Sequence, residues 1–241
     1  MAKLEGKVAI VTGGSRGIGL ATARALVADG ARVVISSTTA DGAAKVAREL
    51  GPAVVGVRAD VRIEADVEAV FAAAVTAFGG LDILINNAGV GIFERVDRLS
   101  LAQFEQVIDT NLTGVFRCTR LALPLLKARG GGWIINISSL AGRNPFPSGA
   151  VYCASKAALN AFTDALMQEV RQDGIRVASV APGSVRTEFM TRAHGAPQVP
   201  AADDSWKLAP EDVAEAVMGL LGHPGRSLPS LVEIRPARTR A

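Results

Sequence analysis

Short apolar runs rich in β-branched residues alternate along this chain with longer stretches of helical spacing. The seven apolar runs are Val8–Val11, Val33–Ser36, Val54–Val57, Leu81–Ile85, Trp133–Ile137, Ile175–Ala181 and Leu231–Ile234. The stretches of helical spacing include Gly17–Ala28, Asp41–Leu50, Ala65–Phe78, Leu101–Ala128 and Ala150–Val170. This alternation builds a parallel sheet with helices on both faces, and strands buried on both faces are nearly continuously apolar. The pattern therefore predicts an α/β fold in which each apolar run is a strand.

Length and composition set the class of the chain. Its 241 residues fit within one α/β domain, and its 49% hydrophobic and 20% charged residues exclude intrinsic disorder. No apolar run approaches the ~18 residues of a membrane span. The residues before Val8 form neither a signal peptide nor an arginine-rich transit segment. We therefore expect a single domain over residues 1–241, located in the cytoplasm and without a membrane partner.

Charge and metal-ligating residues exclude two further classes. Cys118 and Cys153 are too few for a disulfide framework, and both histidines, His194 and His223, lie too far from them for a familiar zinc spacing. The net charge of +3 is spread along the chain rather than gathered on one segment. We expect no bound metal and no nucleic-acid partner.

A glycine-rich turn joins the first predicted strand to the first predicted helix. It covers Thr12–Gly19 and has the spacing Gly-x-x-x-Gly-x-Gly. Glycines let a backbone approach a pyrophosphate closely, and the positive end of the following helix stabilises the phosphate charge. An isolated pair of glycines is more often a tight structural turn, but the strand before this one and the helix after it favour phosphate binding.

Tyr152 is the only tyrosine of the chain and lies four residues before Lys156 in a predicted helix. Four residues make about one helical turn, so the two side chains share a face. A nearby ammonium lowers the pKa of a phenol from ~10 and makes it a usable proton donor. Such a pair is more often a surface rim pair. However, Ser138 with Ser139, and Asn86–Gly89, end neighbouring strands at the edge where open α/β sheets bind ligands, so we expect all these groups in one crevice.

Several motifs occur together in one order along the chain. They are Thr12–Gly19, Asp60 with Val61, Asn86–Gly89, Asn111, Ser139, Tyr152 with Lys156, and Pro182 with Gly183 followed by Thr187. In this ordered set, from about Lys3 to Leu221, the sequence resembles the short-chain dehydrogenase/reductase family. Within that family it resembles NADP-dependent members that are similar to 3-oxoacyl-ACP reductases.

The resemblance implies four catalytic residues, which are Asn111, Ser139, Tyr152 and Lys156. Tyr152 would give its proton to the carbonyl oxygen during reduction, and Ser139 would hydrogen-bond and orient that oxygen. Lys156 would hold the nicotinamide ribose hydroxyls and lower the pKa of Tyr152. Asn111 would interrupt backbone hydrogen bonding in its helix and hold a water relay to the lysine. The hydride itself belongs to the cofactor.

The resemblance also implies which residues contact the cofactor. They would be Gly13, Ser15, Arg16, Gly17, Ile18, Gly19, Ser37, Thr38, Asp60, Val61, Asn87, Ala88, Gly89, Tyr152, Lys156, Pro182, Gly183, Val185 and Thr187. The glycine-rich turn would hold the pyrophosphate, and Asp60 with Val61 would contact the adenine. Val185 and Thr187 would contact the nicotinamide carboxamide.

The end of the second predicted strand distinguishes NAD from NADP. An NAD site places an Asp or Glu there to accept both ribose hydroxyls, whereas in this chain the first acid after the strand is Asp41, which begins the next predicted helix. The hydroxyls of Ser37 and Thr38 can hydrogen-bond a 2′-phosphate, and Arg16 can add charge-assisted contacts. The alternative is that these residues carry no selectivity. We expect NADP(H) as the cofactor.

For the architecture, the resemblance implies a single Rossmann-type doubly wound domain. Its seven-stranded parallel sheet would have the order 3-2-1-4-5-6-7, with helices on both faces. The apolar residues of Ala150–Val170 spread around more than one face of their helix, which indicates a subunit contact. The family pairs this helix across a twofold axis, so we expect a homodimer or homotetramer. The ending, Leu231–Pro236 followed by basic residues, departs from the family's glycine-rich ending and leaves a second, tetrameric interface open.

The substrate pocket is expected from variable segments of the chain. These are Gly142–Gly149 and Glu188–Trp206, with a substrate lid over about residues 188–208. Thr191–Asp204 is the one irregular stretch, and it is either part of the lid or a surface loop. Five side chains suggest an apolar pocket: Phe93, Phe146, Phe189, Met190 and Trp206. Arg143 or Arg192 could meet an acidic group, although each is more often a solvated surface arginine.

The expected substrate is a small carbonyl or alcohol compound. We expect reduction of a ketone or a 3-oxoacyl-type carbonyl to a secondary alcohol, because the apolar pocket favours such substrates over free sugars. One alternative is an alcohol or polyol dehydrogenase that works oxidatively. Another, from a different class, is a non-catalytic dinucleotide-binding scaffold.

Overall fold

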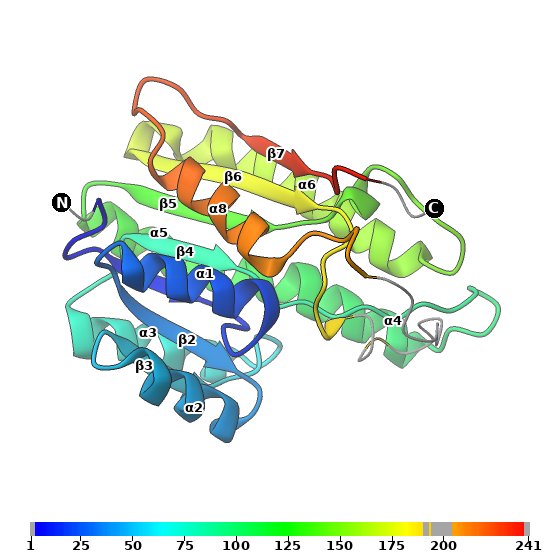
Figure 1. Ribbon diagram of the computed structural model, residues 1–241, viewed down its shortest axis with the longest axis horizontal. Helices are drawn as coiled ribbons and strands as arrows, with labels where there is room; N and C mark the ends of the chain where they lie inside the picture. Colours follow the sequence, from blue (N-terminus) through cyan, green and yellow to red (C-terminus); the bar gives the residue numbers. More distant parts are fainter. Residues whose placement is uncertain (1–2, 190–192, 194–203, 239–241) are drawn as a thin grey trace.

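The computed structural model describes residues 3–189, 193 and 204–238 of the chain. Its strands are β1 (Val8–Val11), β2 (Arg32–Ser37), β3 (Val54–Arg58), β4 (Ile83–Asn86), β5 (Gly132–Ile137), β6 (Ile175–Pro182) and β7 (Leu231–Ile234). They form one sheet of seven strands in the order β3-β2-β1-β4-β5-β6-β7, and every pair is parallel. The fold class and the strand order predicted from the sequence are therefore confirmed (Figure 1).

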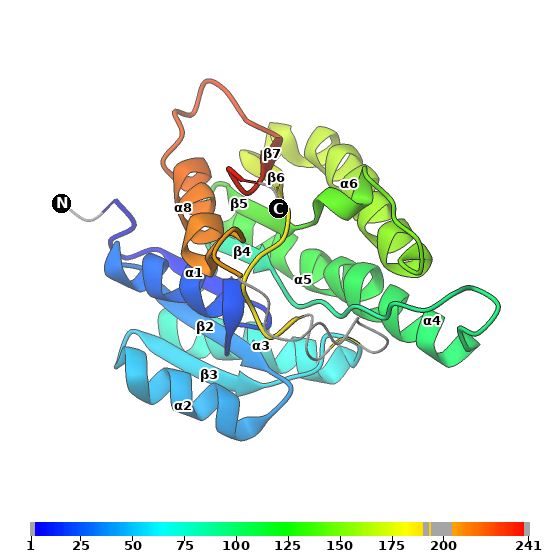
Figure 2. The ribbon, with the colours of Figure 1, turned by 45° about the vertical axis from the view of Figure 1, so that its right-hand side comes forward.

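Helices cover both faces of this sheet. The α-helices are α1 (Gly17–Ala28), α2 (Ala40–Leu50), α3 (Glu64–Phe78), α4 (Leu101–Ile108), α5 (Gly114–Ala128), α6 (Ala150–Val170) and α8 (Pro210–Leu221). Three shorter helical turns are η1 (Asp109–Thr113), η2 (Leu140–Gly142) and η3 (Arg171–Asp173). Figure 2 shows α1, α2 and α8 on one face of the sheet and α3, α5 and α6 on the other.

The side chains of β1 show how the sheet divides the core. Ala9 and Val11 belong to a buried cluster with residues of α1, α2 and α8, whereas Val8 and Ile10 belong to a second cluster with residues of α3, α5 and α6. Successive side chains of a strand point to opposite faces, so a strand with a core on both faces must be apolar throughout. The buried sheet therefore explains the continuous apolar runs of the sequence.

The structure differs from the sequence prediction between Leu101 and Ala128. One helix was predicted there, but α4 and α5 are joined by the π-helical turn η1, in which backbone hydrogen bonds span five residues. The sequence prediction did not separate α4 from α5, because no glycine or proline lies within η1. The helix α8, which the predicted helices did not include, begins with Pro210 and has two acids in its first turn.

In the part of the chain that the structure describes, no helix is long and apolar enough to cross a membrane. The same residues contain no group of three or more His, Cys, Asp or Glu side chains placed to hold a metal ion.

Candidate active site

A cavity of about 1160 Å³ lies at the carboxyl edge of the sheet. Parallel strands end at the same edge, so the chain segments that follow β1, β2, β4, β5 and β6 meet there. Most residues predicted to bind the cofactor or to act in catalysis line this cavity: Gly13, Ser15, Arg16, Gly17, Ile18, Ser37, Thr38, Asp60, Val61, Asn87, Ala88, Gly89, Ser139, Tyr152, Lys156, Pro182, Gly183, Val185 and Thr187. The two predicted residues outside the lining are Gly19 and Asn111, and each contacts residues that do line it.

The glycine-rich turn is fixed to the end of β4 by hydrogen bonds. The hydroxyl of Thr12 accepts from the backbone amides of Asn87 and Ala88, at 3.0 Å in both cases. The side-chain amide of Asn87 donates to the carbonyl oxygens of Thr12 at 2.8 Å and Gly13 at 3.1 Å. The turn is therefore tied to the segment that follows β4, which places both segments on the cavity.

The turn has the shape that a pyrophosphate needs. Gly13 and Gly17 have φ angles of +64° and +53°, which side chains disfavour. A Cβ on Gly19 would lie 2.4 Å from the carbonyl oxygen of Gly13, so the turn closes against the first residues of α1 without room for one. No side chain caps the amino end of α1, which leaves its amides and the positive end of the helix dipole for an anion. These residues fit a dinucleotide.

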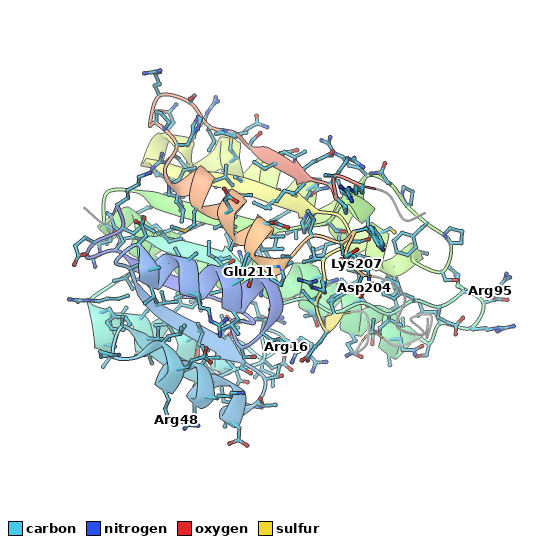
Figure 3. All side chains as sticks on the ribbon, viewed as in Figure 1. Arg16, Arg48, Arg95, Asp204, Lys207 and Glu211 are labelled. Atoms are coloured by element: carbon cyan, nitrogen blue, oxygen red, sulfur yellow. The ribbon has the colours of Figure 1, made fainter. Side chains whose placement is uncertain are left out.

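The end of β2 carries hydroxyls rather than a carboxylate. Ser36 and Ser37 are buried, Thr38 is exposed, and all three line the cavity. The nearest acid in the lining is Asp60, which follows β3 and pairs with Arg62 at 2.6 Å. A hydrogen bond from Arg62 holds the pKa of Asp60 below its ordinary value. Figure 3 shows Arg16 at the amino end of α1, which places a cation at this part of the cavity.

Tyr152 and Lys156 lie on the buried face of α6, one turn apart. The ammonium of Lys156 donates to the carbonyl oxygen of Ile137 at 2.8 Å, and its Nζ lies 6.0 Å from the centroid of the tyrosine ring. The ring of Tyr152 packs between Phe93 and Phe189, with centroid distances of 5.5 Å and 5.8 Å. The helix thus presents a phenol and an ammonium to the same cavity.

Burial dominates the titration of both groups. It raises the pKa of Tyr152 to about 12, while a hydrogen bond from the Ser139 side chain opposes it. It lowers the pKa of Lys156 to about 8. The sequence argument that the ammonium lowers the pKa of Tyr152 is therefore wrong. The reason is that Lys156 is bound to the Ile137 carbonyl, and the apolar wall around the phenol disfavours the phenolate.

Asn111 lies in the π-helical turn, fully buried. Its amide oxygen accepts from the backbone N–H of Val90 at 2.9 Å, and its amide nitrogen donates to the carbonyl oxygen of Val90 at 3.0 Å. The same nitrogen donates to the hydroxyl of Ser155 at 3.0 Å, and that hydroxyl donates to the carbonyl oxygen of Tyr152 at 2.7 Å. Asn111 therefore connects the segment after β4 to α6. Ser155 was missed from the sequence, because a small buried residue beside Lys156 gives no signal of its own.

Aromatic side chains form the apolar wall of the cavity. Phe93, Phe146, Phe189 and Trp206 line it, as the sequence suggested. The Phe93 and Phe146 rings are 5.8 Å apart. Cys153 is buried beside this wall and outside the lining. The predicted lid over residues 188–208 lies largely outside the described residues, and so do Met190, Arg192 and most of Thr191–Asp204.

Three residues after β7 also line the cavity: Arg235, Pro236 and Arg238. The sequence signal was the unusual basic ending of the chain, which the sequence analysis considered only for subunit contacts. Arg143, for which an acidic group of the substrate was considered, forms an ion pair with Glu233 of β7 at 3.4 Å.

The family model described as short chain dehydrogenase matches residues 7–197. The chain is similar to 3beta-hydroxysteroid dehydrogenase 1 of Eggerthella lenta, with 40% identity over 227 residues that cover 90% of this chain and 87% of that protein.

Solved structures are similar over nearly the whole chain. A 3-ketoacyl-(acyl-carrier-protein) reductase from Brucella melitensis, complexed with NADH, has a TM-score of 0.88 and 34% identity, covering 98% of this chain and 99% of that one. An alcohol dehydrogenase from the archaeon Thermococcus sibiricus, complexed with 5-hydroxy-NADP, has a TM-score of 0.86 and 33% identity, covering 98% of each chain. The two hold different dinucleotides, so the likeness alone does not choose between NAD and NADP.

The tight closure of the turn leads to a prediction about Gly19. In Gly19→Ala the new Cβ would meet the Gly13 carbonyl oxygen at 2.4 Å, so the turn must shift and dinucleotide affinity should fall at least about tenfold. Titration of protein fluorescence with dinucleotide measures this change. The matched control is Gly219→Ala on α8, where a Cβ meets nothing within 4 Å. Equal affinities in the two variants would contradict the proposed role of the turn.

Proposed function

The chain belongs to the short-chain dehydrogenase family, and on that premise we propose that it is an NADP(H)-dependent oxidoreductase that reduces a ketone or 3-oxoacyl-type carbonyl to a secondary alcohol. The observation that carries the proposal is the meeting of Ser139, Tyr152 and Lys156 in the cavity that the glycine-rich turn also lines. A scaffold that only binds a dinucleotide would not need this set. We take residues 1–241 as one dinucleotide-binding and catalytic domain.

The bound cofactor would supply the hydride. The hydroxyl of Tyr152 donates a proton to the carbonyl oxygen of the substrate, and the Ser139 hydroxyl donates a hydrogen bond that orients the same oxygen. With a pKa raised to about 12, Tyr152 stays protonated at neutral pH and is ready as the acid of the reduction. Lys156 holds ribose hydroxyls, and its ammonium, released from the Ile137 carbonyl, would stabilise the phenolate that remains after the transfer.

Asn111 acts through its neighbours rather than on the substrate. Its side chain hydrogen-bonds Val90 and Ser155. In this proposal the π-helical turn around it would offer backbone groups to a water relay that returns a proton toward Lys156. We assign the catalytic set as Asn111, Ser139, Tyr152 and Lys156.

For the cofactor we propose NADP(H). Ser37 and Thr38 offer hydroxyls where an NAD-selective site would carry a carboxylate, and Arg16 lines the same cavity. The one acid of that region, Asp60, is paired with Arg62, so its charge is compensated near a 2′-phosphate. In this assignment the turn from Gly13 to Gly19 holds the pyrophosphate. The lining residues after β3 and β4 bind the adenine and ribose, and those from Pro182 to Thr187 bind the nicotinamide.

The substrate proposal rests on the aromatic wall. Phe93, Phe146 and Phe189 surround Tyr152 with apolar surface, which suits a medium-sized hydrophobic carbonyl compound. Two similar proteins fit this class by name, since one is a hydroxysteroid dehydrogenase and one a ketoacyl reductase. Oxidation of an alcohol or polyol is the second candidate, favoured by the similarity to an alcohol dehydrogenase.

We also propose that the protein is a homodimer or homotetramer paired through α6. Four alanines on the outward face of this helix are exposed, namely Ala154, Ala157, Ala161 and Ala165, and Phe116 on α5 is 50% exposed. Small side chains let two helices approach closely around a twofold axis.

The assignment of Tyr152 as the acid of the reaction can be tested by removing its hydroxyl. Tyr152→Phe removes the hydroxyl and keeps the ring packed against Phe93 and Phe189, so turnover should fall by at least about 10²-fold while cofactor affinity stays nearly the same. Initial rates with a hydrophobic ketone, followed by NADPH absorbance, and a cofactor titration measure the two effects. Unchanged turnover would refute the mechanism, and efficient sugar-alcohol oxidation without ketone reduction would favour the second candidate.

The pH profile of the unmodified enzyme separates the tyrosine from the lysine. Lys156 is charged below its pKa of about 8 and loses the charge as the pH rises through that value, whereas Tyr152 with a pKa of about 12 remains protonated. The kcat/KM for reduction should therefore fall as the pH rises through about 8. A flat profile between about pH 6 and pH 10 would contradict the role given to the ammonium.

The next prediction concerns the choice of cofactor. The kcat/KM should favour NADPH over NADH by about tenfold or more, equivalent to ~1.4 kcal/mol. Arg16→Ala combined with Thr38→Asp should remove this preference, because the cation is lost and a carboxylate would repel the 2′-phosphate. The control is Arg24→Ala, an exposed arginine of α1 that pairs with Glu49 away from the cavity. Equal use of both cofactors by the unmodified protein would overturn the proposal.

The last prediction of this section concerns assembly. Sedimentation should show a dimer or tetramer, and Ala161→Arg should shift it to monomers because it places a charge in the middle of the α6 face. Ala69→Arg, on the exposed side of α3, should leave the assembly intact. A monomer in the unmodified protein would contradict the proposed contact.

A further inference from the structure

The chain after β7 forms a basic wall of the cavity. Arg235, Pro236 and Arg238 line it, and we call Arg235–Arg238 the C-terminal tail. The proposed catalytic set and the cofactor assignment use none of these residues. The tail could therefore contact another partner in the same cavity.

The tail lies at the substrate end of the cavity. Ile234 of β7 pairs with Pro182 of β6, and the backbone N–H of Gly183 donates to the carbonyl oxygen of Ile234 at 2.8 Å. A Cβ on Gly183 would lie 3.1 Å from Cδ of Pro236, so the tail packs directly on the segment after β6. Because β7 and β3 are the two outer strands of the sheet, the tail is far from the end of β2, where Arg16 and Thr38 lie. In Figure 1 the tail follows β7, on the half of the sheet away from α2.

An acid in β7 holds the tail in place. Glu233 accepts from Arg143, in the loop after η2, at 3.4 Å and from Arg235 at 3.0 Å. The same loop carries Phe146 of the aromatic wall, so the tail and this wall are neighbours. The single carboxylate of Glu233 thus pairs with two arginines, so this group of three side chains carries one net positive charge.

Few acids balance this charge. Within the described part of the chain, Arg238 has no ion-pair partner, and Lys207 of the lining is paired with Asp204 at 2.7 Å (Figure 3). The acid that lines this end of the cavity is Glu188. The substrate end therefore combines an apolar wall around Tyr152 with a cationic border.

We propose that the C-terminal tail binds an anionic group of the substrate, so that the enzyme favours carbonyl compounds with an apolar body and a carboxylate or similar anion at the far end. This rests on the carbonyl reduction proposed above. An arginine guanidinium presents several donors to a carboxylate, and such charge-assisted hydrogen bonds are stronger than neutral ones. With a ketone that has no anionic group, the guanidinium donors of the tail would hydrogen-bond only to water.

The experiment compares matched ketones that differ only in charge. The probes are para-acetylbenzoate and para-acetylphenylbutanoate, each with its methyl ester, so that two distances between carbonyl and anion are sampled. We expect the ratio of kcat/KM for acid over ester to be at least about tenfold for one of the pairs, mainly through KM. The ratio should decrease with added salt, because Arg235 is partly exposed and salt screens such charges.

Variants assign the effect to the tail. In Arg235→Gln combined with Arg238→Gln, the acid-to-ester ratio should fall about tenfold. The matched control is Arg226→Gln, an exposed arginine in the loop after α8 that does not line the cavity. It makes the same chemical change and should leave the ratio as in the unmodified enzyme.

Failure of this inference differs from failure of the proposed function. Reduction of esters and acids with equal kcat/KM, or an equal loss for both in the double variant, would overturn the tail proposal and leave carbonyl reduction standing. If no probe were reduced, the result would contradict the proposed reduction of hydrophobic ketones. The tail would then be judged by binding, since the acids but not the esters should raise the melting temperature, and the double variant should lose that shift. Equal shifts for acid and ester would overturn the tail proposal.

Discussion

The hydroxyl of Thr12 joins the two strands between which the cavity opens. It is buried at the end of β1 and accepts hydrogen bonds from two consecutive amides after β4, while the Asn87 side chain returns a bond to the Thr12 carbonyl. In an open α/β sheet the strand order reverses at this point, and ligands bind in the crevice that opens there. Hydrogen bonds connect the glycine-rich turn, the segment Asn87–Val90 and, through Asn111, the helix α6 to this junction.

The sequence predicted those parts of the site that depend on local spacing. The turn could be found because strand, glycines and helix are contiguous, and the Tyr152–Lys156 pair could be found because one helical turn separates them. Parallel strands ending at one edge then placed Ser139 beside them. The parts that could not be predicted depend on contacts between distant segments: the π-helical turn around Asn111, the bond from Lys156 to the Ile137 carbonyl, and the tail that packs on Gly183.

The pKa values of Tyr152 and Lys156 also depend on contacts that local spacing does not show. A tyrosine near a lysine suggests a lowered pKa when only their spacing is known. In the folded chain both groups are almost completely excluded from water, so burial opposes each charged form and keeps the pair neutral at high pH, with Tyr152 protonated. The apolar environment that raises the pKa of Tyr152 is made by the same aromatic rings that would contact the substrate. The same aromatic wall would therefore set both the pKa of Tyr152 and the preference for apolar substrates.

Asn111 removes degrees of freedom from the active site. Its side chain binds both backbone groups of Val90 and the Ser155 hydroxyl. Hydrogen bonds therefore hold together three segments that are distant in sequence: the one after β4, the π-helical turn and α6, which we call the triangle. Helix α6 cannot rotate or slide relative to the segment after β4 without breaking buried hydrogen bonds, each of which costs about 1–3 kcal/mol when a partner is left unsatisfied. Adaptation to differently shaped substrates must therefore come from segments outside the triangle, such as the loop that carries Phe146, where Ser148 has a φ angle of +63°. Rigidity around the reacting groups and adaptability around the substrate are in this way assigned to different parts of the chain.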